Sequence, residues 1–462
     1  MAAQKVVHIS VPVSTEVLNA NPDASLKGAY HDGALVITVD TRKQNVHQRL
    51  GLPTRTRLHF GRDNEFFVQE LSGLAWPIRY RVRTRDGYYI GDNGERVHFT
   101  TSAGGLDARR GASLVLMRAA VLLIIVGGMG YRRAAWLLKE LFQVELSKST
   151  LCRWVEEIAS SLPSGDEMIL ALHAEKAITE AHFDEIFPRG TNRCVLVLQD
   201  EHGRIIATDE IDKRDEATVV PFLERMKRLG LPLSAFYIDG CKAYYNAIRT
   251  VFGEAVAIQY DYFHILQNVW KKLGKWALDR RRRIKERAEA SWTPWYQQKL
   301  RALAKSLWEN RYLLFKADER LTGAERAKLT ELVEAECHVG RLRAFLGGVW
   351  DIFENSRDEA EARLALARLK RMSIERAHPE APQQVVRYLE EHFDWMTAYL
   401  RHEGVRRNSL AESGMRTLRR LEIEHDGFRS KQGREKALRI YQAVKYLDWS
   451  VHRVPLPEAE PA

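Results

Sequence analysis

Cysteine is scarce in this sequence, with four residues in a chain of 462 that lie far apart. No two of them have the spacing of a zinc ribbon, and their number is too small for a framework of disulfide bonds. These absences exclude a small secreted domain that depends on cross-links, and they are typical of a reducing cytosol. The four residues are Cys152, Cys194, Cys241 and Cys337.

Long hydrophobic segments are also missing. The longest apolar run, AAVLLIIVGGMGY from Ala119, is too short to span a bilayer and directly follows Arg118. The N-terminus does not show the basic-then-apolar pattern of a signal peptide. We therefore expect a soluble, cytoplasmic protein with no part in a membrane.

Acidic residues are the minority among the charged side chains, with 61 against 71 basic ones and a formal net charge of +10. This excess favours an anionic partner such as nucleic acid or a membrane surface, although many soluble proteins are basic without binding DNA. With 45% hydrophobic residues, a chain of this length can form three or four domains, each with its own core.

Residues 1–108 carry the signals of short strands. ALVITVD and IRYRVRT are β-branched or alternate between apolar and polar residues, and RDGYYIGDNGERVHF contains Asp-Gly and Asn-Gly, which favour hairpin turns. The pattern predicts a β-rich accessory region, and no residue in it points to a chemical function.

Residues 109–165 change to a helical pattern. Two apolar helices, SLVLMRAAVLLIIVGG and YRRAAWLLKELF, precede a Ser- and Thr-rich turn and a third helix in VELSKSTLCRWVEEIA. This order indicates a helix-turn-helix, whose last helix would enter the major groove of DNA with its N-terminus first. Any three-helix bundle would show the same pattern. The candidate DNA-binding residues are Lys148, Ser149, Thr150 and Arg153.

Residues 166–274 contain the clearest architecture. Three strands in AHFDEIF, CVLVLQD and GRIIATDEI follow one another as a meander, and a helix, a strand, a second helix and a last strand come next. This order is typical of a ribonuclease-H-like α/β sheet, so we predict the first part of a catalytic core of that fold class.

Two carboxylates lie where such a sheet could hold metal ions. Asp184 lies on the first strand and Asp239 ends the fourth, and both strands occupy the middle of such a sheet. Phosphoryl transfer to water or a hydroxyl uses two divalent ions about 4 Å apart, and Mg²⁺ prefers carboxylate oxygens on rigid elements. The alternative is that both residues merely end strands, as aspartate often does.

A third carboxylate has to come from later in the chain. In residues 401–450, NSLAESGMRTLRRL predicts a helix that Glu412 opens, with arginines beside its apolar side that could hold phosphates. Glu422 and Glu424 are rivals at the highly charged far end, and a solvated amphipathic helix is the alternative. The arginines are Arg416, Arg419 and Arg420. Residues 451–462 form a tail.

The stretch YDYFHILQN, residues 260–268, places Asp261 and His264 at the end of the last strand, ahead of a basic helix. His264 would lie one turn into that helix, where it could contact a scissile phosphate or help protonate a leaving oxygen. The alternative is a structural histidine that is hydrogen-bonded beneath the sheet.

Residues 275–400 are rich in helix and would be inserted between the two parts of the core. The dense basic run DRRRRIKER is either a solvated helix face or a track for DNA phosphates. We expect the nearby tryptophans, Trp292, Trp295 and Trp308, to form part of the core of this insertion and not to stack on bases. The candidate phosphate ligands of the run are Arg280, Arg281, Arg282 and Arg283.

Together, Asp184, Asp239, QYDYFHILQNVWKKL and the later RNSLAES and GFRS resemble the DDE transposases of bacterial insertion sequences. The likeness is greatest to the supergroup that shares features with Mutator-like and hAT elements. In that group a Cys/Asp-x-x-His motif follows the second acid, and a long helical insertion precedes the third. The resemblance covers roughly residues 110–450. The N-terminal β-rich region matches nothing in that family, and the zinc ribbon of some relatives is missing.

The resemblance implies a transposase that cleaves the ends of its element and joins the 3′-hydroxyls to target DNA. It implies two Mg²⁺ or Mn²⁺ ions per active site, held by Asp184, Asp239 and Glu412, and double-stranded DNA as the partner. At least a dimer is expected, because two ends must be brought together. The alternatives are a catalytically silent DNA-binding protein derived from a transposase and, less consistent with the insertion and the helix-turn-helix, a nuclease of the same fold.

Overall fold

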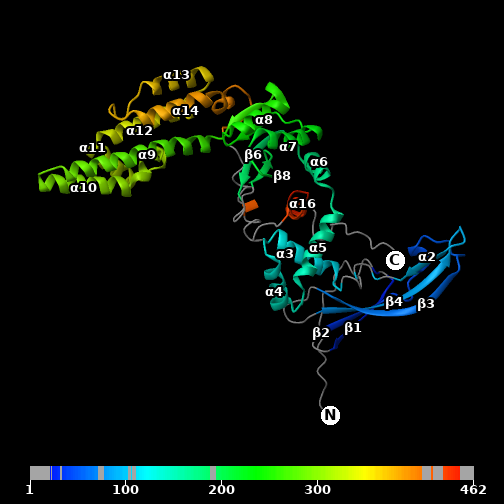
Figure 1. Ribbon diagram of the computed structural model, residues 1–462. Helices are drawn as coiled ribbons and strands as arrows, with labels where there is room; N and C mark the ends of the chain where they lie inside the picture. The colour runs from blue at the N-terminus through cyan, green and yellow to red at the C-terminus, as the bar shows by residue number, and fades with distance from the viewer. Residues whose placement is uncertain are drawn as a thin grey trace, which may run out of the picture. The chain divides into compact units, whose positions relative to one another are not determined.

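The structure is a computed structural model, and its described residues divide into two compact units, each taken by itself below (Figure 1). The predicted third acid Glu412, its rivals Glu422 and Glu424, and Arg416 and Arg420 lie outside the described residues. The described residues are 21, 23–31, 34–70, 78–101, 103, 106, 111–187, 194–407, 418–419 and 430–447.

The first unit begins with a five-stranded sheet in the order β1-β2-β4-β3, with β5 paired to β4. β2 and β4 run parallel, and the other neighbours are antiparallel. The predicted hairpin turn at Asn93-Gly94 lies between β4 and β5, whereas the one predicted at Asp86-Gly87 is wrong, because both residues lie within β4 and pair with β5. The elements are β1 (Ser25–His31), β2 (Ala34–Asp40), α2 (Val46–Arg49), β3 (Leu58–Gln69), β4 (Ile78–Ile90) and β5 (Arg96–Thr100).

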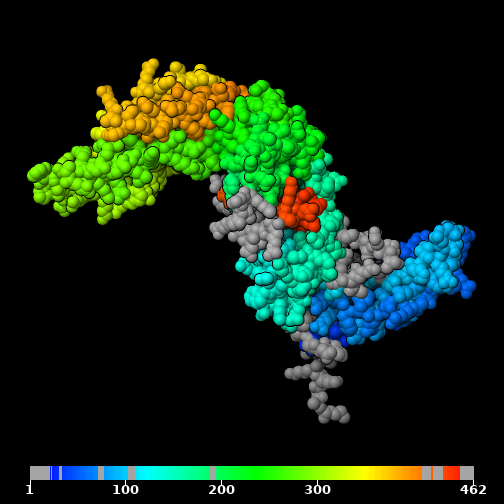
Figure 2. Space-filling view, in the orientation of Figure 1, coloured from blue at the N-terminus to red at the C-terminus, as the bar shows by residue number. Residues whose placement is uncertain are grey.

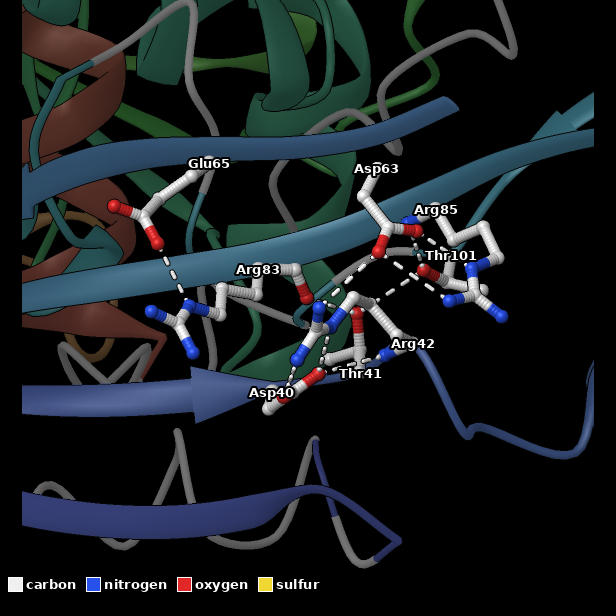
Figure 3. A network of polar contacts seen from close by, with 8 residues as sticks. All are labelled: Asp40, Thr41, Arg42, Asp63, Glu65, Arg83, Arg85 and Thr101. Atoms are coloured by element: carbon white, nitrogen blue, oxygen red, sulfur yellow. Dashed lines mark hydrogen bonds and ion pairs between the residues drawn. The ribbon is translucent and has the colours of Figure 1, made fainter. Parts of the chain in front are cut away.

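The two faces of this sheet differ because side chains alternate along a strand. On β4, Ile78, Tyr80 and Val82 are buried in a small core, and the residues between them carry arginines on the opposite face. There the Asp63 carboxylate forms ion pairs with Nη1 of Arg42 at 3.1 Å and Nε of Arg85 at 2.6 Å (Figure 3). Exposed ion pairs contribute little to stability, so this network mainly orients the arginines across neighbouring strands.

A helical bundle follows in the same unit. Serine side chains cap four of its helices, since Ser113, Ser147, Ser164 and Ser430 each accept a hydrogen bond from a backbone amide of the first turn. The helices share one core with Trp154 fully buried. They are α3 (Leu114–Ile125), α4 (Tyr131–Phe142), α5 (Lys148–Ser161), α6 (Gly165–Glu175) and α16 (Lys431–Tyr446).

The position of α16 differs from the sequence-based expectation, which assigned residues 401–450 to the catalytic core. Its apolar residues Ala437, Ile440 and Ala443 join the core of the bundle. Lys436 lies 3.2 Å from Glu156 of α5, and Arg439 donates to backbone carbonyls after the end of that helix. Helix α16 thus completes the bundle at a sequence distance that no local pattern reveals.

The second unit contains the other five-stranded sheet, in the order β10-β9-β6-β7-β8. β6, β7 and β8 form an antiparallel meander, and β9 and β10 run parallel to β6. Meander, helix and strand thus follow in the expected order. The elements are β6 (Glu180–Ile186), β7 (Cys194–Gln199), β8 (Ile205–Ile211), α7 (Glu216–Arg228), β9 (Ala235–Ile238), α8 (Lys242–Phe252), η1 (Gly253–Ala255) and β10 (Ala257–Tyr260).

A helical insertion leaves this sheet at the end of β10. Its first helix begins after the N-cap Asp261, and the insertion shares one large apolar core that also includes Tyr260. The helices are α9 (Tyr262–Glu289), α10 (Pro294–Glu309), η2 (Arg311–Phe315), η3 (Asp318–Arg320), α11 (Gly323–Ala335), α12 (Cys337–Trp350), the π-helical η4 (Asp351–Asn355), α13 (Glu359–Lys370), α14 (Glu380–Met396) and η5 (Ala398–Leu400).

A buried side chain of the sheet bonds to the end of the insertion. Gln259 of β10 donates to the carbonyl of Met396 at 3.1 Å and accepts from the amide of Tyr399 at 2.9 Å. These bonds fix the end of α14 beside the strand from which α9 departs. Within the described ranges, no helix has the length and apolarity needed to cross a membrane.

Candidate active site

Asp184 lies on β6 and Asp239 directly follows β9, and these two strands are neighbours inside the second sheet. The parallel register pairs His182 with Tyr237, whose rings stack at 4.2 Å, and each aspartate lies two residues further along its strand. Side chains two residues apart share a face, and neighbouring strands are about 4.8 Å apart. The register therefore puts the two predicted acids at corresponding positions of neighbouring strands, although many residues separate them in the sequence.

Two further side chains belong to this cluster, and the sequence analysis missed both. Glu185 of β6 accepts a short hydrogen bond from the hydroxyl of Tyr244 on α8. Its other oxygen lies 2.5 Å from Nη2 of Arg214, and the same nitrogen lies 2.8 Å from Oδ2 of Asp239. Arg214 comes from the loop between β8 and α7, so it connects two carboxylates through one guanidinium group.

The electrostatics of the cluster reflect crowded negative charge. The pKa of Glu185 is raised to about 7, chiefly by burial and also by the nearby Asp239 and Asp184 carboxylates, against the hydrogen bond from Tyr244 and the charge of Arg214. Burial also raises the pKa of the Tyr244 hydroxyl far above its usual value. The site thus concentrates acids around one fixed cation.

The turn after β9 fixes the direction of the Asp239 carboxylate. Gly240 has φ of +86°, and a Cβ there would lie about 2 Å from the ring of Tyr260, so only glycine fits. The turn lets the amide of Cys241 donate to Oδ1 of Asp239 at 3.1 Å. Arg214 and this amide therefore hold the two oxygens of Asp239 from different sides.

Asp261 and His264 lie at the predicted place, after β10 and in the first turn of α9. The Asp261 carboxylate caps the helix by accepting from the amides of Phe263 at 2.7 Å and His264 at 3.3 Å. Nδ1 of His264 is 3.8 Å from that carboxylate, and about a third of the side chain is exposed. Asp261 thus has a structural role at the helix end, which also positions the imidazole.

The chain comes back to this edge of the sheet shortly before Glu412. The amide of Arg406 donates to the hydroxyl of Tyr237 at 2.8 Å, and the carbonyl of Arg407 accepts from the amide of Tyr262 at 3.3 Å. The last described residues before Glu412 therefore pass beside Tyr237 of β9 and the start of α9.

The predicted DNA-binding residues of the bundle lie at the start of α5. Lys148, Ser149 and Arg153 are exposed there, and Thr150 is half-buried with its amide bonded to the cap Ser147. The opposite face of α5 carries the buried residues. An exposed helix N-terminus with basic side chains is what contact with DNA phosphates requires.

The basic run on α9 separates into two kinds of arginine. Arg280 is buried and ion-paired with Glu336 at 2.9 Å and Glu375 at 3.1 Å, and Arg283 also pairs with Glu375 at 2.8 Å. These two hold the insertion helices together. Arg282 has 68% of its side chain exposed, and Arg281 stacks on Trp308.

The expectation that the tryptophans form the insertion core is wrong for the three nearest the basic run. Their exposed fractions are 97% for Trp292, 64% for Trp295 and 38% for Trp308. Trp276, within α9 itself, is buried in the core instead. The core of the insertion consists mainly of aliphatic residues, and these three tryptophan rings face solvent instead.

The family model for DDE transposases of the ISL3 type, described as a transposase, matches residues 182–433. The match covers more than half of the chain and includes both aspartates, the Asp261–His264 motif and Glu412. The chain belongs to this family of insertion-element transposases. No curated protein matches it.

Proposed function

We propose that the protein binds the ends of its own mobile element and carries out metal-dependent cleavage of DNA strands and their transfer to target DNA. The observation that carries this proposal is that Asp184 and Asp239 take corresponding positions along the adjacent parallel strands β6 and β9, in a sheet with the strand order β10-β9-β6-β7-β8. Family membership supports the reaction class. The family's usual setting also supports a cytoplasmic location, and the Asp-x-x-His motif supports kinship with Mutator-like and hAT elements.

The donor set fits divalent cations. Mg²⁺ and Mn²⁺ prefer carboxylate oxygens, and the site already holds one cation, the Arg214 guanidinium, against Asp239 and Glu185. Asp184, Asp239 and Glu412 would hold two such ions. When bound, the ions would activate the attacking oxygen and stabilise the leaving one.

Glu412 is supported as the third acid by the position of the residues before it. Glu412 comes five positions after Arg407, whose carbonyl is bonded beside the start of α9. That length spans at most about 17 Å, so the Glu412 carboxylate can reach the face that carries Asp184 and Asp239.

The chain's own residues would orient the substrate and move the proton. The exposed part of His264, held beside the Asp261 cap, can donate a proton to a leaving oxygen or contact the scissile phosphate. Arg214 would hold the carboxylates of Glu185 and Asp239 in fixed orientations. The arginines that follow Glu412, Arg416, Arg419 and Arg420, would contact phosphates.

Binding of the element ends is proposed for the bundle. As the recognition helix of a helix-turn-helix, α5 would place Lys148, Ser149, Thr150 and Arg153 against the major groove. On the insertion, Arg281 and Arg282 would contact phosphates. Arg280 and Arg283 are ion-paired with glutamates and are not proposed as DNA contacts. Two ends require at least a dimer on DNA.

The test is to incubate the purified protein with DNA that carries its own flanking ends, with Mg²⁺ or Mn²⁺, and to sequence the products. We expect nicks at the element ends and new junctions between those ends and target DNA. Specific binding without any nick would favour the alternative, a silent DNA-binding protein. Cleavage of any branched or unrelated DNA without joining would favour a nuclease.

A further inference from the structure

The end of the hairpin formed by α9 and α10 carries two tryptophans that the proposed chemistry does not use. Trp292 lies in the turn between the helices with 97% of its surface exposed, and Trp295 follows in the first turn of α10 with 64% exposed. Figure 2 shows this end, at the left of the view, projecting beyond the neighbouring helices of its unit. Apolar side chains that gather on a surface can mark a binding site.

The turn that presents these rings is held in place. The amide of Thr293 donates to the Ser291 hydroxyl at 3.3 Å, and the Gln297 side chain donates to the Ser291 carbonyl at 2.5 Å. Trp295 contacts the edge of Tyr296, whose hydroxyl accepts from Arg287 at 3.0 Å. Hydrogen bonds therefore fix the turn that carries the exposed rings, and Arg287 is bonded to the tyrosine next to Trp295.

The charge of the hairpin identifies the kind of partner. Between Lys275 and Tyr312 the sequence has eleven basic and four acidic side chains, and two of the basic ones, Arg280 and Arg283, are already ion-paired with glutamates of the insertion. Further along the hairpin, Trp308 is covered by Arg281 at 4.7 Å and Arg311 at 4.1 Å, which orients two more guanidinium groups. A positive surface with open aromatic rings is complementary to a nucleic-acid strand, whereas two copies of the same hairpin would repel each other.

We propose that this surface, Trp292 and Trp295 with Arg287, binds unpaired DNA by stacking bases on the two rings. An unpaired strand is favoured over a duplex because a duplex keeps its base faces stacked inside and offers nothing to a flat ring. The proposal rests on the proposed function, since unpaired strands arise where element ends are cut and joined. α9 has 28 residues, so its far end lies about 42 Å from the edge of the sheet that carries the acids.

That distance makes the surface separate from the cleavage chemistry. About 42 Å corresponds to roughly 12 base pairs of duplex at ~3.4 Å each. The surface would therefore hold a strand well away from the scissile phosphate, and its loss should change strand capture without changing the metal site.

The experiment measures binding of a fluorescent oligo-dT and of a duplex element end to the full chain by anisotropy. The double variant Trp292→Ala/Trp295→Ala should bind the oligonucleotide about tenfold or more weakly, because stacking on each ring is lost, and should bind the duplex as wild type does. Trp292→Phe/Trp295→Phe should retain most of the affinity. The matched control is Leu364→Ala, which removes a 63% exposed apolar side chain from α13 and should change neither binding constant.

Unchanged oligonucleotide affinity in the alanine double variant, with an unchanged melting curve, would overturn the proposal. If the same variant instead dissociates an oligomer of the wild-type protein in sedimentation, the surface joins two copies and the proposal is likewise overturned. Failure of wild type to bind its duplex ends would count against the proposed function alone, since the oligonucleotide comparison still reports on the hairpin.

Discussion

Arg214 joins Glu185, which is buried beneath α8, to Asp239 at the end of β9. A buried carboxylate without a partner is costly, so this arginine stabilises an arrangement of acids that would otherwise repel one another. Its guanidinium contacts Oδ2 of Asp239, an oxygen that could otherwise bind a divalent cation. Arg214 is therefore the residue that should compete with metal binding.

Replacing Arg214 tests this competition without an activity assay. Arg214→Ala should lower the melting temperature in the absence of divalent ions, because Glu185 keeps the Tyr244 hydroxyl but loses its cation. Mn²⁺ should then raise the melting temperature more in the variant than in wild type, since ligand binding stabilises the folded state and no guanidinium opposes it. The neighbouring exposed residue offers a control, Lys213→Ala, which should match wild type. Equal Mn²⁺ effects in variant and wild type would refute the competition.

Substitution of His264 distinguishes a catalytic role of this residue from a structural one. If the imidazole contacts the phosphate or a leaving oxygen, His264→Ala should slow cleavage by roughly 10²-fold, the scale of a positioned acid–base group. The melting temperature should stay close to wild type because a third of the side chain is exposed. A large drop in melting temperature together with normal cleavage at low temperature would assign His264 a structural role instead.

At the scale of elements, substitutions in α5 should show whether this helix recognises the base sequence of the element end or only contacts DNA phosphates. The double variant Lys148→Ala/Arg153→Ala should weaken binding of the element end by about tenfold or more, because both residues are exposed at the start of the helix. The comparison is binding of random duplex of equal length. An equal loss on both DNAs would make these residues phosphate contacts, and no loss on either would place end recognition outside α5.

The basic run on α9 allows a matched pair of substitutions. Arg280→Ala leaves Glu336 and Glu375 buried without their shared cation, and breaking a buried pair costs about 3–5 kcal/mol. Arg282→Ala removes an exposed side chain and should leave the unfolding free energy nearly unchanged while reducing DNA affinity at low salt. Denaturant unfolding of both variants measures this, and similar stabilities would contradict the division into structural and exposed arginines.

Over the whole molecule, local patterns predicted the elements well where the pattern itself determines the structure. Alternation along β4, the serine cap before α5, and the order of strands and helices from β6 to β10 all follow from spacing that can be read in the sequence. The same strand order put Asp184 and Asp239 on neighbouring strands.

Features that depend on distant contacts could not be predicted. Arg214 lies in an irregular loop, and nothing in its neighbourhood of the sequence indicates that it meets Glu185 and Asp239. Arg280 and Arg282 are two residues apart in one basic run, yet only the packing of α9 against the other insertion helices decides which is buried. The exposure of Trp292 was missed because tryptophan is usually counted toward a core.

Cleavage of the protein's own element ends by wild type and three ligand variants tests the central claim most directly. Asp184→Asn, Asp239→Asn and Glu412→Gln each remove a charged oxygen ligand and little volume. With Mg²⁺ or Mn²⁺, wild type should nick the ends, and each variant should lose cleavage while still binding the same DNA nearly as tightly. Full cleavage by any one variant would remove that residue from the metal site, and full cleavage by all three, or by wild type in EDTA, would contradict the account.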